Sequence, residues 1–344
     1  MHTIQNTLYV MTPHAYAHLE NATVRIDVER EKKLQVPLHH IGGLVTFGNI
    51  MVSPALMHRL ADEGKSLVLL DESGRFKARL EGPVSGNILL RKAQHAKSSS
   101  ESTTLELARH IVAGKLKNSR SVLMRGARES YEPEEAKQLT RAADNLAASL
   151  RAARSATTLD ELRGIEGEAA RGYFTALNLI VKTHARDTFF LNGRSRRPPR
   201  DCFNALLSFF YAMLMNDCRS ALEAVGLDPQ LGFLHAVRPG RAALALDLQE
   251  EFRSILADRL ALTLINRSQL TAEDFDEREG GAVMLNDKGR RKAVIAWQER
   301  KQEEIIHPLT ESKMPIALLP LIQARFMART LRNEMESYLP YLHK

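Results

Sequence analysis

One histidine and three acidic residues have the types and spacing of a metal-dependent active site. His235 precedes a Gly-Arg turn, and Asp247 and Glu250 follow it at the start of an apolar helical segment. Positions three apart project from the same face of a helix, so both carboxylates point the same way. With Glu166, the donor set suits Mn²⁺ or Mg²⁺ acting on a phosphodiester. We therefore take Glu166, His235 and Glu250 as candidate catalytic metal ligands, with Asp247 as a nearby acid.

The position of Glu166 on its own helix also favours a cationic partner. Thr158 and Glu161 form a capping-box pattern, which predicts the start of a helix that continues to about residue 181. Glu166 lies one turn after Leu162, at the edge of the apolar face of this helix. An unpaired carboxylate is costly to bury, so Glu166 needs either a metal ion or an arginine beside it.

Each candidate ligand has a second explanation that the spacing leaves open. A single histidine before a turn often has only a structural role, and the carboxylates can pair with arginines instead of a metal ion. The polar residues of the helix after the turn can also be its solvated face, and these are Asp247, Glu250, Glu251, Ser254 and Asp258.

Arginines are concentrated near these candidates and match the geometry of phosphate groups. The loop at residues 192–200 carries several of them, and the Gly-Arg turn after His235 carries another. A guanidinium group donates two parallel hydrogen bonds to phosphate oxygens, but exposed arginine-rich loops also occur without a ligand. The candidate DNA-binding residues are Arg194, Arg196, Arg197, Arg200 and Arg241.

The composition favours an acidic partner and argues against several classes of protein. The chain has 344 residues, a formal net charge of +7 and a pI near 9.4, which favours nucleic acid or an anionic membrane surface. Cys202 and Cys218 show no paired spacing, so neither a disulfide framework nor a thiolate zinc site is indicated. No unbroken apolar run reaches the length of a membrane span, and no signal peptide is recognisable. We expect a cytoplasmic protein without a membrane partner.

The hydrophobic pattern predicts an α+β fold, with a small, mostly antiparallel β domain followed by a larger all-α domain. Residues 3–82 contain short strand-like runs, in one of which Val24 and Ile26 alternate with polar residues. Ser53 marks the start of one helix inside this region. We expect a β-rich dimerisation domain at 1–83, a linker and connecting helix at 84–100, and a helical catalytic domain at 101–344.

The expected elements of the helical domain follow from caps and apolar spacing. Pro133 begins one helix, and Asp201 caps a long apolar helix that ends at Gly226. A further helix is predicted over 244–265, and a hairpin is expected around residues 287–289. The last two helices are expected at 291–305 and 315–338.

Three groups of residues resemble the CRISPR-associated integrase, protein one of the CRISPR adaptation machinery. The first is the run at 164–170 with Tyr173 and Phe174, the second is 197–201 with Asn204 and Tyr211, and the third is 232–235 followed by 240–241 and 246–253. The likeness covers the full length and looks most like the type I-C branch. One departure is Ser254, where relatives often have proline, at what we expect to be a helix surface position.

The resemblance implies a reaction, a metal site and partners. In that family a glutamate, a histidine and a later acidic residue bind Mg²⁺ or Mn²⁺, and these correspond to Glu166, His235 and Glu250. The reaction is the insertion of short foreign DNA as new spacers, by attack of a 3′-hydroxyl of a prespacer duplex on the CRISPR repeat. The implied assembly contains a homodimer formed through the β domains. Two such homodimers are bridged by a dimer of CRISPR-associated protein two, which gives a heterohexamer.

Two other functions agree with the same residues. The chain can be a metal-dependent nuclease of branched DNA that never integrates. It can also be a helical DNA-binding scaffold without chemistry, in which the carboxylates pair with arginines and salt weakens DNA binding.

Overall fold

The computed structural model describes residues 6–72, 74, 76–80, 82, 88–195 and 197–343. The chain separates into two compact units, Met1–Ser85 and Gly86–Lys344. The expected domain boundary at residue 83 and the candidate DNA-binding residue Arg196 lie outside the described residues. In the part of the chain that is described, no helix has the length and apolar content needed to cross a membrane.

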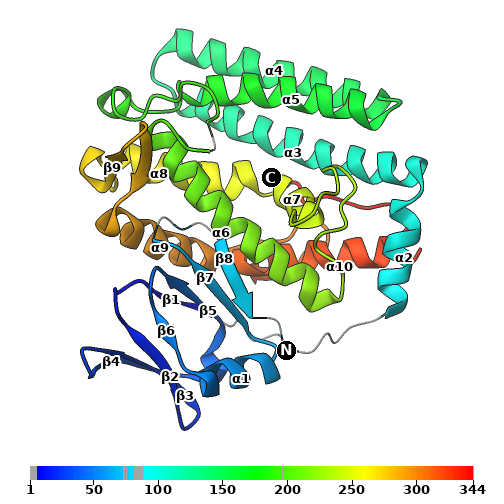
Figure 1. Cartoon of the computed structure of the whole chain (residues 1–344). Coiled ribbons are helices and arrows are strands. Elements are labelled where there is room, and N and C mark those ends of the chain that lie inside the picture. Colours follow the sequence, from blue (N-terminus) through cyan, green and yellow to red (C-terminus); the bar gives the residue numbers. More distant parts are fainter. Residues whose placement is uncertain are drawn as a thin grey trace. The chain divides into compact units, whose positions relative to one another are not determined.

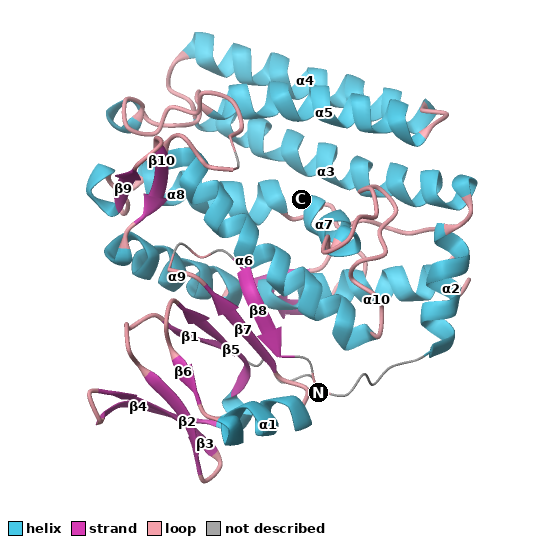
Figure 2. Ribbon diagram, viewed as in Figure 1, coloured by secondary structure: helices cyan, strands magenta, loops and turns pink. Residues whose placement is uncertain are grey.

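The described residues of the first unit form two four-stranded sheets, one α-helix and a short 3-10 helix at Leu38–His40 (Figure 2). One sheet has the order β1 (Asn6–Val10), β5 (Ile41–Phe47), β7 (Ser66–Leu70) and β8 (Phe76–Leu80). The other has the order β4 (Glu31–Pro37), β3 (Thr23–Val28), β2 (Tyr16–Glu20) and β6 (Met51–Val52). As the alternation predicts, Val24 and Ile26 are buried in the core, while Arg25 pairs with Asp27 at 2.7 Å on the other face.

The prediction of a mostly antiparallel β domain is wrong, because half of the strand pairs among the described residues are parallel. The parallel pairs are β1–β5, β5–β7 and β2–β6, and the antiparallel pairs are β2–β3, β3–β4 and β7–β8. The helix α1 (Pro54–Asp62) lies between β5 and β7 in the chain, and such a crossover allows two strands to run in parallel. Ser53 caps α1 as predicted, since its Oγ accepts a hydrogen bond from the Leu56 amide at 3.2 Å.

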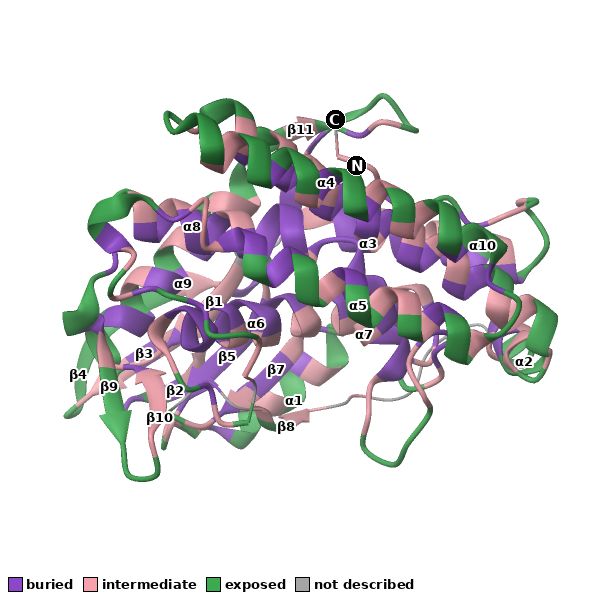
Figure 3. Ribbon diagram, turned by 90° about the horizontal axis from the view of Figure 1, so that it is seen from above, coloured by how far each residue is buried: buried purple, intermediate pink, exposed green. Residues whose placement is uncertain are grey.

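The second unit is built mainly from helices. Along the chain they are α2 (Ile88–Ser98), α3 (Glu101–Glu129), α4 (Pro133–Ser155), α5 (Leu159–Leu177), α6 (Cys202–Val225), α7 (Ala243–Glu250), α8 (Arg259–Asn266), α9 (Asp287–Gln302) and α10 (Leu319–Leu331). The long helices α3, α4 and α5 pack along one another, and α6 packs against α7 and α10 (Figure 1). On α4, buried and exposed residues alternate along the helix, as expected of an amphipathic surface helix (Figure 3).

The helical unit also contains two small hairpins, so the prediction of an all-α domain is wrong. They pair β9 (Phe275–Arg278) with β10 (Ala282–Leu285), and β11 (Glu304–Ile306) with β12 (Lys313–Pro315). The hairpin expected at 287–289 lies earlier, because its turn is formed by Gly280 and Gly281 at positive φ. Asn286 instead caps α9, accepting a hydrogen bond from the Gly289 amide at 2.9 Å.

The cap of α5 matters because this helix carries Glu166. Thr158 Oγ1 accepts a hydrogen bond from the Glu161 amide at 3.2 Å, as the sequence predicts. The Glu161 carboxylate accepts from the Thr157 amide at 2.7 Å, one residue before the position expected for a capping box.

Replacing Thr158 by alanine is expected to lower the free energy of unfolding by about 1 kcal/mol, while serine keeps the hydroxyl and most of the stability. Denaturation followed by the fluorescence of Trp297, which lies in the same unit, measures both changes, and equal losses in the two variants would contradict the capping role.

Candidate active site

The polar stripe that follows His235 is buried, which rules out the solvated-face explanation. Asp247, Glu250, Glu251, Ser254 and Asp258 are each at most 2% exposed. Ser254 is therefore not the helix surface position that we expected. The predicted helix is also interrupted: α7 ends at Glu250, the segment Arg253–Asp258 is π-helical, and α8 begins at Arg259. Widened turns of this kind are frequent at functional sites, and each buried carboxylate here needs a partner.

Asp247 fixes the orientation of His235. Its Oδ2 accepts hydrogen bonds from the Phe233 and Leu234 amides at 2.6 and 3.0 Å, and its Oδ1 accepts from the His235 amide at 2.9 Å. The same Oδ1 lies 2.7 Å from His235 Nδ1. Because a carboxylate only accepts, Nδ1 carries the proton, and in a neutral ring Nε2 is left to bind a cation.

The close approach of the Asp247 carboxylate explains the glycine at position 232. A Cβ atom on Gly232 would lie 2.7 Å from Asp247 Oδ2 and 2.7 Å from the carbonyl carbon of Ala243. A larger residue would therefore displace the backbone that carries the three amide donors. The motif residues Gly232, His235 and Asp247 thus form one local unit, which the sequence spacing alone did not reveal.

Glu166 and Glu250 are brought together around the ammonium group of Lys115. Lys115 Nζ donates to Glu166 Oε1 and lies 2.7 Å from Glu250 Oε2. The side chains of Glu166, Lys115 and Glu250 are 23%, 12% and 3% exposed, so the cluster opens to solvent on the Glu166 side. The edge position predicted for Glu166 is therefore confirmed, and its partner in the structure is a lysine.

The charge state of Glu250 is set by its cationic neighbours. Burial by itself raises the pKa of this carboxyl, but Arg253 and Lys115 outweigh that effect and bring the pKa to about 2. Arg253 Nη1 donates to Glu250 Oε1 at 2.5 Å, and His235 Nε2 lies 3.7 Å from the same oxygen. Glu250 is thus ionised at neutral pH and lies beside His235.

The donor chemistry of this cluster fits a hard divalent cation. Glu166 and Glu250 offer carboxylate oxygens, and His235 offers an imidazole nitrogen fixed by Asp247. In the described part of the chain, no three His, Cys, Asp or Glu side chains are already arranged tightly enough to hold an ion. Lys115 supplies the positive charge between the two carboxylates, so a divalent ion has to take over the role of this ammonium.

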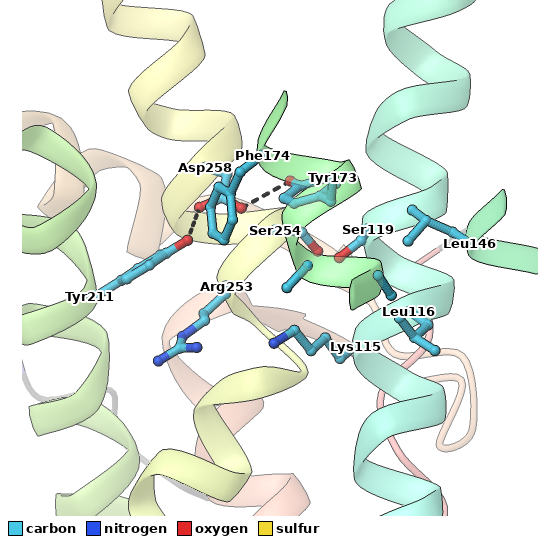
Figure 4. A pocket seen from close by; sticks show the side chains of 12 residues that line it. Lys115, Leu116, Ser119, Leu146, Tyr173, Phe174, Tyr211, Arg253, Ser254 and Asp258 are labelled. Carbon is cyan, nitrogen blue, oxygen red and sulfur yellow. Dashed lines mark hydrogen bonds between the residues drawn. The ribbon is translucent and has the colours of Figure 1, made fainter. Parts of the chain in front are cut away.

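A small cavity beside Lys115 is built around Asp258 (Figure 4). Its volume of about 20 Å³ has room for a single water molecule. Asp258 Oδ1 accepts from the Tyr211 hydroxyl at 2.6 Å, and Oδ2 accepts from the Tyr173 hydroxyl at 2.9 Å. Burial raises the pKa of Asp258 to about 6, although both tyrosine hydrogen bonds lower it. Arg253 lies over the Tyr211 ring, 4.8 Å from its centre, and links this cavity to Glu250.

The structure places the candidate DNA-binding arginines in different environments. Arg194 points inward: its guanidinium donates to Asn204 Oδ1 at 2.6 Å and to Ser208 Oγ at 3.1 Å, and it lies 5.2 Å from the centre of the Tyr211 ring. Arg197 and Arg200 are exposed, and Arg200 donates to the Gly280 carbonyl at 2.7 Å. Arg241 is partly exposed, and its backbone amide donates to the Arg238 carbonyl at 3.1 Å. DNA contact by these arginines stays a prediction, and a structural role of Arg194 is visible.

Sequence reasoning missed Lys115 and the role of Asp258. Lys115 lies on α3 among the buried positions Ile111, Val112 and Leu116, so a charged residue inside an apolar stripe was the available signal. The spacing does not reveal the π-helical segment Arg253–Asp258, so it cannot show that Asp258 faces inward.

Comparison with known proteins decides the family. The family model for CRISPR associated protein Cas1 matches residues 8–299. The chain belongs to the Cas1 family. A CRISPR-associated endonuclease Cas1 from Moorella thermoacetica is 52% identical over 344 residues, which is 100% of each chain. The resemblance noted from the motifs is confirmed at the level of the family, and the type I-C branch stays a prediction.

Solved structures share the fold of this Cas1 family member. A casposase bound to its integration product has a TM-score of 0.85 at 20% identity, over 99% of this chain and 95% of that one. A Cas6-RT-Cas1–Cas2 complex has a TM-score of 0.84 at 22% identity, over 100% of this chain and 37% of that longer one. The β-rich first unit and the helix-rich second unit agree with this fold.

Proposed function

We propose that this Cas1 family member is a divalent-metal-dependent DNA integrase and endonuclease, which inserts short foreign DNA fragments into a CRISPR array. The observation that carries the proposal is the convergence of Glu166, His235 and Glu250 from three separate segments of the helical unit. Its curated relatives are named endonucleases, and a casposase with a similar fold was solved with an integration product.

The chemistry of the site follows from the residues that build it. Glu166, His235 and Glu250 would hold an Mg²⁺ or Mn²⁺ ion, which when bound would supply Lewis-acid stabilisation of a phosphodiester and activation of a 3′-hydroxyl nucleophile. Asp247 holds the imidazole of His235 in one tautomer and orientation. Arg253 and Lys115 keep positive charge beside Glu250, where negative charge on a phosphate would also be stabilised.

The partners are proposed on the basis of charge and family. A net charge of +7 suits double-stranded DNA, both as prespacer and as CRISPR repeat. A chain of similar fold is part of a solved complex with Cas2, which supports Cas2 as a partner here. We further propose a homodimer through the β-rich unit, and a heterohexamer with Cas2.

Two other candidate functions keep a specific basis in the structure. A branched-DNA nuclease would use the same three donors. A non-catalytic scaffold would use its carboxylates only in ion pairs, and the pairs of Glu250 with Arg253 and Lys115 are of that kind. The three functions differ in what becomes of the covalent structure of DNA.

The deciding experiment follows a labelled duplex with a free 3′-hydroxyl and a plasmid that carries a CRISPR repeat. The full-length protein is incubated with both, with and without Cas2, in Mg²⁺, in Mn²⁺ and in a chelator. Metal-dependent joining of label to plasmid establishes the integrase. Cleavage without joining, even with Cas2 present, favours the branched-DNA nuclease. Salt-sensitive binding that survives chelation, with the DNA intact, favours the scaffold.

The position of Lys115 predicts that removing its charge strengthens metal binding. In Lys115→Met the two carboxylates lose the ammonium that they share, so a divalent ion no longer competes with it. We expect the Kd for Mn²⁺ to fall on the order of tenfold, equivalent to about 1.4 kcal/mol. Titration followed by electron paramagnetic resonance of free Mn²⁺ measures this without any activity assay.

A matched control lies on the same helix. Lys117 is exposed on α3, and Lys117→Met removes the same charge away from the carboxylates. Its Kd for Mn²⁺ should stay close to that of the parent chain. Unchanged or weaker binding in Lys115→Met would show that the ammonium does not occupy the role of the ion.

A further inference from the structure

A second cluster of cationic side chains lies away from Glu166 and Glu250 and takes no part in the chemical step proposed above. It surrounds a cavity of about 300 Å³ in the helical unit, lined by Ser121, Val122, Arg125, Arg128, Glu129, Arg259 and His343. On α3, Arg125 follows Lys115 by ten residues, which places it about 15 Å further along the helix axis. The cavity is therefore separate from the candidate active site.

Positive charge predominates around this cavity. Among the described residues that line it are three guanidinium groups and one carboxylate, Glu129, which already accepts from Arg125 Nε at 2.7 Å. Arg259 Nη1 donates to His343 Nε2 at 2.8 Å, so the imidazole acts as a neutral acceptor. Burial lowers the pKa of His343 to about 4, with Arg259 as the next cause, so the ring is uncharged at neutral pH and the positive charge of the cavity comes from the arginines.

The arginines are close enough to repel one another. Burial, followed by the neighbouring Arg125 and Arg300, lowers the pKa of Arg259 to about 10. Arg300 lies nearby with an acidic partner of its own, Glu303. Like charges held together in this way are stabilised by an anion that all of them can reach.

We propose that this cavity binds a phosphate group, supplied either by the backbone of bound DNA or by free inorganic phosphate. Guanidinium groups match phosphate oxygens in pairs of parallel hydrogen bonds. A volume of about 300 Å³ is at the lower end of the range of about 300–1,000 Å³ for small-ligand pockets. The proposal goes beyond the integrase function, because anion binding here requires neither a divalent metal nor catalysis.

The test uses inorganic phosphate as the probe, with chelator present and ionic strength held constant with NaCl. Phosphate at about ten times its Kd is expected to raise the Tm of the full chain by about 3 °C. The double variant Arg125→Gln/Arg128→Gln removes two exposed rim guanidiniums and should lose most of this shift. Arg141→Gln, an exposed arginine on α4 outside the cavity, should keep it. No shift in the parent chain, or equal shifts in all three proteins, would overturn the proposal.

A DNA-binding measurement identifies the source of the phosphate group. For a 20-base-pair duplex, the slope of log K against log of salt concentration should decrease by about 1 in the double variant if the cavity holds a backbone phosphate. An unchanged slope together with a lost phosphate shift assigns the cavity to the free anion. Either result supports the pocket, and both can be obtained even if no strand transfer is detected.

Discussion

Replacing Glu166 by glutamine is expected to reduce strand transfer about 100- to 1,000-fold, the loss that follows when one group that stabilises charge is removed from an active site. Glutamine keeps the size of the side chain but lacks the negative charge that Lys115 now neutralises. The variant therefore cannot hold a divalent cation between positions 166 and 250. Quantifying label joined to a repeat-bearing plasmid at saturating Mn²⁺ measures the loss, and fluorescence anisotropy of the labelled duplex shows whether DNA binding is retained.

A control for this variant lies two residues further along α5. Glu168 is exposed and pairs with Arg171 at 3.0 Å, away from the site. Glu168→Gln changes charge and shape in the same way and should keep strand transfer close to that of the parent chain. If Glu166→Gln retained strand transfer with normal DNA binding, Glu166 would not be a ligand, and the carboxylate–lysine pair would have only a structural role.

Elements governed by local interactions were predictable from the sequence. Asp201 caps α6 by accepting a hydrogen bond from the Asn204 amide at 2.7 Å, and Gly226 ends that helix at a φ of 91°. Ser53, Thr158 and Pro133 mark helix starts where they were expected. In all these cases the side chain or backbone interacts with residues only a few positions away, so the sequence spacing is enough to predict the helix end.

Features that depend on distant parts of the chain were not predictable in the same way. Strand alternation shows which residues face the core, but both parallel and antiparallel pairs satisfy it, so the direction of β1, β5 and β7 was missed. The predicted hairpin turn at Lys288–Gly289 is wrong, because Asn286 caps α9 and these two residues lie in the first turn of that helix. The turn is formed by Gly280 and Gly281 instead.

The candidate site has features that are local in sequence and features that depend on distant parts of the chain. Motif spacing selected Glu166, His235, Asp247 and Glu250, and the structure brings these four residues into one region. The spacing could not show that Lys115 bridges two of them, since this lysine lies on α3, far from them in sequence. Nor could it show that the polar face of the following helix is buried, because the π-helical segment Arg253–Asp258 changes which residues face inward.

The parent chain is expected to lose stability as the pH rises from about 4 to about 6, because Asp258 loses its proton in this range. Replacing Asp258 by asparagine is expected to abolish this loss. An exposed aspartate in the unfolded chain titrates near pH 3.9, whereas burial raises the pKa of folded Asp258 to about 6. Between these two values the folded state binds more protons than the unfolded state, so the free energy of unfolding decreases as pH rises. A difference of about two pKa units corresponds to about 3 kcal/mol.

Asparagine does not titrate, yet its amide can still meet the hydroxyls of Tyr173 and Tyr211. The free energy of unfolding of Asp258→Asn, relative to the parent chain, should therefore increase by about 2 kcal/mol from pH 4 to pH 7. Urea titrations at several pH values, followed by the fluorescence of Trp297, measure this difference within the helical unit. The exposed Asp187, changed to asparagine, provides the control and should give a nearly constant difference. A flat difference for Asp258→Asn as well would mean that this carboxyl titrates alike in the folded and unfolded chain, and that Arg253 and Arg194 compensate fully for its burial.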